Sequence, residues 1–137
     1  MMVHIVYVMK MIWGIEMKNL NLEMLDTLSK LDMNVPLYKK VIKLQEEVGE
    51  LSQEFLAYDD KKLGVKTNAS KSAAGTLASV IEETCDVVNV AIDILNWLEM
   101  QPEVKETLGE NYIEEEFNRK LLKWYSKVNA KAEKTGE

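Results

Sequence analysis

The clearest periodic pattern in the chain begins at Leu37. From there, apolar residues recur at alternating steps of three and four, the spacing of one narrow stripe along an α-helix. Pro36 stands just before the stripe, and the first turn of a helix tolerates proline. A helix is therefore predicted from Leu37 to about Tyr58, with its stripe packed against another helix. The stripe consists of Val41, Leu44, Val48, Leu51, Phe55 and Tyr58.

A second long apolar pattern covers residues 73–100 and predicts another helix. Its apolar positions form two stripes, so this helix is expected to be buried over most of its circumference. One stripe contains Ala74, Ala78, Ile81, Cys85, Val88, Ile92 and Leu95, and the other contains Leu77, Val80, Val87, Ala91, Ile94 and Leu98.

Shorter patterns complete a helical chain. Residues 19–34 carry apolar positions at helical spacing and predict a first helix, whereas residues 59–72 have no apolar period and predict a loop. Few β-branched alternations, two prolines and six glycines argue against a sheet protein. The fold class predicted is all-α, a bundle of four to five helices.

The C-terminal third predicts two more helices. Residues 102–108 form a short one that Gly109 ends, and Asn111 followed by Glu114 is a capping signal for a last helix to about Lys134. The expected buried face of that last helix is Phe117, Leu121, Trp124 and Val128.

Residues 1–18 form an apolar N-terminal extension that Lys10 and Glu16 interrupt. The run is too short to span a bilayer and lacks a basic start and a small-residue cleavage site, so neither a membrane anchor nor a signal peptide is expected. Two interpretations stay open: a translated leader before a start at Met17, or a short extra strand. Residues 19–134 are predicted to form a single domain.

Length and charge narrow the class of protein. A chain of 137 residues suits one domain, and a net charge of −6 argues against binding to a nucleic acid polymer. The lone Cys85 cannot form an intramolecular disulfide, which favours a cytoplasmic location, and with the lone His4 it excludes a Cys/His zinc site. The surplus of apolar stripes is expected to be buried between subunits of a homodimer or homotetramer.

Both long helices carry an acidic stripe. Glu47, Glu50 and Glu54 stack beside the apolar stripe of the first, and a polar line of Glu82, Asp86, Asn89, Asp93 and Asn96 runs along the otherwise apolar second. Solvated faces of exposed helices are one interpretation. The other is a cluster that faces the core and requires cations.

The second interpretation favours a metal site. The nearest basic residues, Lys40 and Lys43, precede the acidic cluster by one turn or more, and residues 73–100 contain none. Carboxylate oxygens select hard cations such as Mg²⁺ or Mn²⁺.

The same acidic residues carry a family resemblance. Glu46-Glu47-x-x-Glu50, followed by Glu83-x-x-Asp86, resembles the metal-binding signature of the MazG-like all-α nucleoside triphosphate pyrophosphohydrolases. That superfamily also includes dimeric dUTPases and phosphoribosyl-ATP pyrophosphohydrolases. Thirty-two residues separate the two motifs, more than is common in the family, so residues 59–72 are expected to be an insertion.

A third segment extends the resemblance over residues 19–127. Asn118-x-Lys120-Leu121-x-Lys123 is similar to the closing segment of the family, with leucine and lysine in place of an aromatic residue and arginine. The resemblance implies that Lys120 and Lys123 contact substrate phosphates, although lysine offers a point charge where arginine would form a fork.

The resemblance implies hydrolysis of a nucleoside triphosphate to a monophosphate and pyrophosphate. Glu47, Glu50, Glu83 and Asp86 would hold Mg²⁺, with Mn²⁺ as a substitute. Catalysis would fall to Glu46, Glu47 and Glu50, with Glu46 as the base or as a residue that orients a ligand.

Several alternatives stay open at the level of sequence. Asn89 and Asp93 lie one and two turns beyond Asp86 and either contact ribose or a second metal, or hydrogen-bond inside the bundle. The chain could also be a non-enzymatic interaction protein that metal stabilises, or a hydrolase of the same fold for a special nucleotide such as an alarmone. The sequence ranks neither bases nor sugars.

Overall fold

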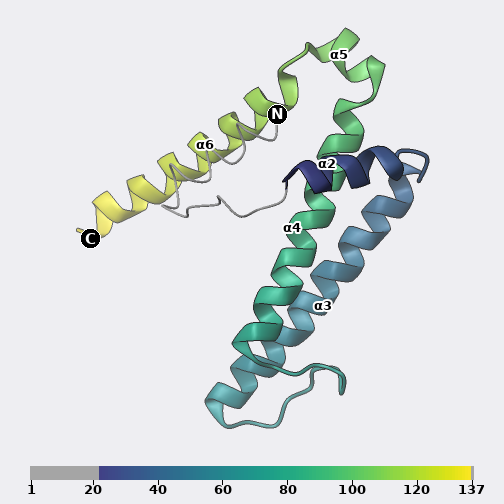
Figure 1. The fold of residues 1–137 in the computed structure, drawn as a ribbon. Coiled ribbons are helices and arrows are strands. Elements are labelled where there is room, and N and C mark those ends of the chain that lie inside the picture. The colour runs from purple at the N-terminus through teal and green to yellow at the C-terminus, as the bar shows by residue number, and fades with distance from the viewer. Residues whose placement is uncertain (1–21, 137) are drawn as a thin grey trace. The chain divides into compact units, whose positions relative to one another are not determined.

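The computed structural model describes residues 22–136, and the N-terminal extension predicted over residues 1–18 lies outside them. Every regular element of the described chain is helical, which confirms the all-α class (Figure 1). The helices are α2 (Leu22–Leu31), α3 (Leu37–Leu63), α4 (Leu77–Glu99), α5 (Pro102–Leu108) and α6 (Tyr112–Thr135). Within residues 22–136, no helix is long and apolar enough to cross a membrane.

The described chain divides into two compact units. One is Glu23–Leu98, which contains α3, α4 and nearly all of α2, and the other runs from Glu99 through α5 and α6. The interpretation of residues 19–134 as a single domain stays a prediction.

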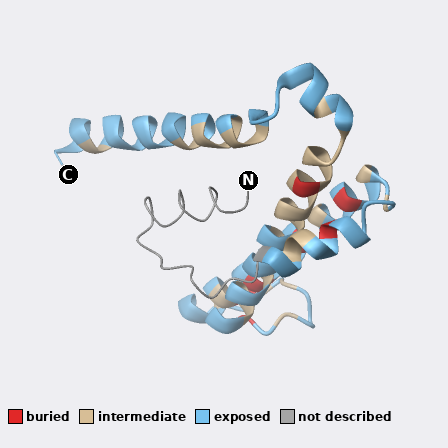
Figure 2. Cartoon of the chain, turned by 45° about the horizontal axis from the view of Figure 1, so that its top comes forward, coloured by how far each residue is buried: buried red, intermediate tan, exposed pale blue. Residues whose placement is uncertain are grey.

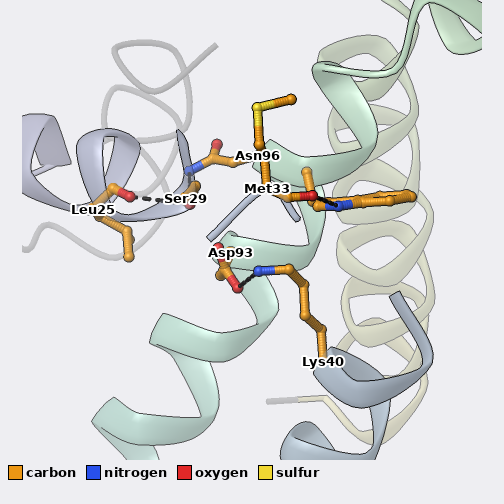
Figure 3. Close-up of polar contacts among 7 residues, drawn as sticks. Leu25, Ser29, Met33, Lys40, Asp93 and Asn96 are labelled. Atoms are coloured by element: carbon orange, nitrogen blue, oxygen red, sulfur yellow. Dashed lines mark hydrogen bonds and ion pairs between the residues drawn. The ribbon is translucent and has the colours of Figure 1, made fainter. Parts of the chain in front are cut away.

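Helices α3 and α4 lie side by side and antiparallel (Figure 1). Two polar contacts fix their register. Glu54 in the second half of α3 accepts a hydrogen bond from Ser79 in the first turn of α4, and Lys40 near the start of α3 pairs with Asp93 in the second half of α4. The short helix α2 joins the pair through Asn96 of α4, whose amide donates to the hydroxyl of Ser29 at 3.2 Å (Figure 3).

Two predicted boundaries around the loop were wrong. Helix α3 continues past Tyr58 to Leu63, where Gly64 adopts φ +70° and its N–H bonds carbonyls of the last turn. Helix α4 begins at Leu77 rather than residue 73, because Thr76 caps it: the Thr76 hydroxyl accepts the Ser79 N–H at 3.0 Å. The loop is therefore residues 64–76, not 59–72. The predicted first helix ends early as well, at Leu31 rather than residue 34.

The buried positions on α3 differ from those expected. Lys40, Glu47 and Glu54, spaced by seven residues, are buried, and we call them the polar stripe. Of the apolar stripe, Val41, Val48 and Phe55 are 40–56% exposed. Its other members, Leu44, Leu51 and Tyr58, are half-buried. Thus α4 contacts the polar stripe, and alternate positions of the apolar stripe stay exposed. Buried segments are few among the exposed and intermediate ones along the chain (Figure 2).

The expectation that α4 is buried around most of its circumference was also wrong for the described chain. Asn96 is its one buried residue, whereas Leu77 and Ile81 are about 60% exposed and Cys85 is exposed. On α6, Trp124 and Val128 of the predicted buried face are more than half exposed. Within the described residues, Ala57 is the one hydrophobic side chain that is fully buried, whereas five polar or charged side chains are: Ser29, Lys40, Glu47, Glu54 and Asn96.

Candidate metal centre

Three carboxylates of the predicted motifs come together between α3 and α4. Glu47, Glu83 and Asp86 each offer one oxygen, and these oxygens lie within 4.8 Å of one another. Glu83 and Asp86 share one face of α4 because they are three residues apart, and Glu47 faces them from the polar stripe of α3. This cluster can hold a metal ion.

The electrostatics of Glu83 fit a bound cation. Its Oε2 atom is buried and has no hydrogen-bond partner within the described residues. Burial raises the pKa of Glu83, and the negative charges of Glu50, Asp86 and Glu47 raise it further. A divalent ion would supply both the missing partner and the missing positive charge.

Lys43 supplies part of the positive charge that the cluster needs. The expectation that the lysines lie too far from the cluster was therefore wrong for Lys43. Lys43 Nζ lies 2.5 Å from Glu47 Oε1 and 3.4 Å from Glu46 Oε2. The hydrogen bond to Glu47 raises the pKa of Lys43. Lys43 is half exposed and contacts one member of the cluster, Glu47, so Glu83 and Asp86 have no ion-pair partner among the described residues.

Glu46 and Glu50 border a cavity of about 630 Å³ that also reaches Glu83. Both are exposed, and Glu50 is not among the three residues whose oxygens converge. The structure therefore brings together three of the four predicted metal ligands. The fourth borders the adjoining cavity, close enough to affect the pKa of Glu83.

Asn89 and Asp93 border a different cavity, of about 300 Å³, together with Lys39, Lys40 and Lys43. The carboxylate of Asp93 accepts a hydrogen bond from the buried Lys40 at 2.6 Å (Figure 3). Of the alternatives for Asp93, the structure shows the hydrogen bond inside the bundle. Asn89 is exposed.

Lys120 and Lys123 lie on α6, in the unit that begins at Glu99, and both are exposed. Their neighbour Arg119 pairs with Glu116 at 2.5 Å within the same helix. Contact of Lys120 and Lys123 with a substrate stays a prediction.

Glu54 has a structural role that the sequence analysis did not identify. Its carboxylate accepts hydrogen bonds from the N–H groups of Ala74 and Gly75 at 3.0 and 2.7 Å and from the Ser79 hydroxyl at 2.6 Å. The bonds from Ser79 and Gly75 hold the pKa of Glu54 below its ordinary value. Glu54 thus anchors the end of the loop to α3, and the Thr76-x-x-Ser79 pattern was a local sign of this helix start.

Comparison with known proteins finds no match to this chain among protein-family models, curated proteins or solved structures. The fold and the site together define an all-α protein with an acidic cluster that can hold a metal ion.

Proposed function

We propose that the chain is a MazG-like, Mg²⁺-dependent nucleotide pyrophosphohydrolase, which converts a nucleoside triphosphate to a monophosphate and pyrophosphate. The observation that supports this most is the convergence of Glu47, Glu83 and Asp86 from two sequence motifs 30 or so residues apart. A carboxylate-only donor set fits Mg²⁺ or Mn²⁺ and disfavours softer metals.

In this mechanism, each acidic residue near the cluster has its own role. Glu47, Glu83 and Asp86 would hold the metal, and Glu50 borders the cavity that also reaches Glu83. The bound metal would supply charge neutralisation for the phosphates and acidify a water molecule. Glu46, which borders the cavity, accepts the proton of the water that attacks the α-phosphorus, while the bond to the bridging oxygen breaks and pyrophosphate leaves.

A second copy of the chain would cover the exposed apolar residues. Val41, Val48 and Phe55 recur every seven residues on α3 and remain 40–56% exposed, the pattern of a helix–helix seam that lacks its partner. We therefore propose a homodimer, or a homotetramer built from it. Light scattering at several protein concentrations measures the assembly, and a monomer throughout would contradict it.

The test of the activity is release of pyrophosphate and monophosphate from a panel of the eight standard nucleoside triphosphates, dUTP and an alarmone, with Mg²⁺ or Mn²⁺. Glu83→Gln removes a cluster charge and is expected to lower turnover at least a hundredfold. Glu82→Gln is the matched control, because it makes the same change one residue away, outside the cluster. Equal turnover by both variants would refute the proposed site.

The exposed apolar residues also fit a second candidate, a non-enzymatic interaction protein that metal stabilises. Mg²⁺ would raise the Tm under both hypotheses, and Glu83→Gln would remove that shift in both. Turnover separates them: a folded, metal-binding protein that hydrolyses no nucleotide on the panel would support the interaction protein.

A further inference from the structure

The loop between α3 and α4 is fixed to α3 next to the candidate metal centre. The Ser70 N–H donates to the Gln53 side-chain oxygen at 2.7 Å, and Glu54 holds the N–H groups of Ala74 and Gly75. Lys61 donates to the Ala74 carbonyl as well. Contacts to α3 at both Ser70 and Ala74 hold the segment between them against that helix.

This segment borders the same cavity as Glu50 and Glu83. Ser70, Ser72 and Ala73 come from the loop, and Gly49 leaves room on α3, since nothing lies within 4 Å of the place where a Cβ would stand. The hydroxyls of Ser70 and Ser72 are 2.8 Å apart and bond each other. Two hydroxyls carry two protons, and one bond uses one of them, so the pair keeps one O–H to donate to a ligand.

The charge of the cavity indicates which kind of ligand the free serine O–H would bind. All the ionisable side chains that border it are glutamates, namely Glu46, Glu50, Glu54 and Glu83. A phosphate group held there through a metal at Glu83 would face carboxylates, which cannot donate hydrogen bonds when ionised. The serine hydroxyls offer a neutral donor in the cavity, and a hydrogen bond to a charged phosphoryl oxygen is about twice as strong as one between neutral groups.

We propose that Ser70 and Ser72 bind the phosphoryl oxygens of the substrate's polyphosphate chain. The inference rests on the proposed function, because the phosphate reaches this cavity through a metal at the Glu47–Glu83–Asp86 cluster. It assigns a binding role to a segment with no phosphate-loop motif: no glycine-rich turn precedes Ser70.

The test uses the double variant Ser70→Ala/Ser72→Ala and titration calorimetry with inorganic tripolyphosphate in excess Mg²⁺. Affinity is expected to fall about tenfold or more, since a charged acceptor loses its donor. Binding of Mn²⁺ alone should stay unchanged, because neither serine belongs to the carboxylate cluster. Ser52→Ala is the matched control: its exposed hydroxyl bonds the Val48 carbonyl within α3 and does not border the cavity.

The readout separates this inference from the proposed activity. If the wild type hydrolyses no nucleotide but binds Mg²⁺–tripolyphosphate, and the double variant binds it tenfold more weakly, the hydroxyl site stands and the enzyme proposal fails. Equal affinity of the wild type and the double variant, or no binding by the folded wild type, overturns the inference. Ser70→Thr/Ser72→Thr keeps both hydroxyls and is expected to retain most of the affinity.

Discussion

Gly75 sits where the loop meets α3, and replacing it with alanine tests the packing there. The residue adopts φ +62°, which favours glycine, and its backbone lies against the buried Ala57. A Cβ at Gly75 would stand 2.8 Å from the Ala57 Cβ and 2.9 Å from the Ala57 carbonyl carbon. Since one of these atoms is backbone, relief requires the loop to move away from α3.

The size of the effect follows from a comparison with two other glycines. Gly64 has φ +70° but nothing within 4 Å, so Gly64→Ala costs about 1–2 kcal/mol for the left-handed conformation alone. Gly75→Ala pays that cost plus about 1–3 kcal/mol for the forced contact. Gly49 lies inside α3 in open space, so Gly49→Ala is expected to stabilise the helix by about 0.5–1 kcal/mol.

Urea unfolding followed by circular dichroism, at one fixed protein concentration, measures all three variants. The entropy that alanine removes from the unfolded chain is common to the three variants, so it cancels when they are compared with one another. The expected order of stability is Gly49→Ala, wild type, Gly64→Ala and Gly75→Ala. The argument fails if Gly75→Ala is no less stable than Gly64→Ala.

Two further predictions concern the polar stripe. Asp93→Ala removes the partner of the buried Lys40 and is expected to lower the free energy of unfolding by about 3 kcal/mol. This is the low end for a broken buried ion pair, because the Asp93 side chain is 21% exposed. A loss below about 0.5 kcal/mol in urea unfolding would contradict this. Because the Ser79 and Gly75 hydrogen bonds hold the pKa of Glu54 below its ordinary 4.5, its stabilising effect is present above that pH and is lost as the pH falls through the lowered pKa. The wild-type Tm should therefore fall more steeply below pH 4.5 than that of Glu54→Gln, and parallel curves would count against the role of Glu54.

The sequence predicted the parts of the site that depend on helical spacing. Glu83 and Asp86 share a face because they are three residues apart. The bounds of the short helix α5 and the start of α6 were predicted as well, although the Asn111 side chain makes no capping hydrogen bond. Spacing on one helix, however, does not show which neighbour that helix meets. The periodicity of α3 showed which apolar residues share a face, but not that the buried positions on this helix include Lys40, Glu47 and Glu54.

Contacts between distant residues explain the rest of what the sequence missed. Lys40 and Asp93 are 53 residues apart in the sequence, and Glu54 and Gly75 are 21 residues apart. No local sequence pattern predicts either pair. The boundary of α4 was misplaced partly for the same reason: Ala73 and Ala74 favour a helix, but Glu54 holds the N–H groups of Ala74 and Gly75 outside it. Glu54 was predicted only as one more member of an acidic stripe.

The candidate metal centre lies between two clamps, Glu54 at one end of the α3–α4 pair and Lys40–Asp93 at the other. An extra residue inserted between Ser79 and Glu83 would turn every later position of α4 by about 100° and carry Glu83 and Asp86 away from Glu47. The same insertion between Gly64 and Thr67 would enlarge a surface turn and leave both clamps in place. An added residue is therefore tolerable at the start of this loop, but not on either helix between the two clamps, where it would separate Glu47 from Glu83 and Asp86.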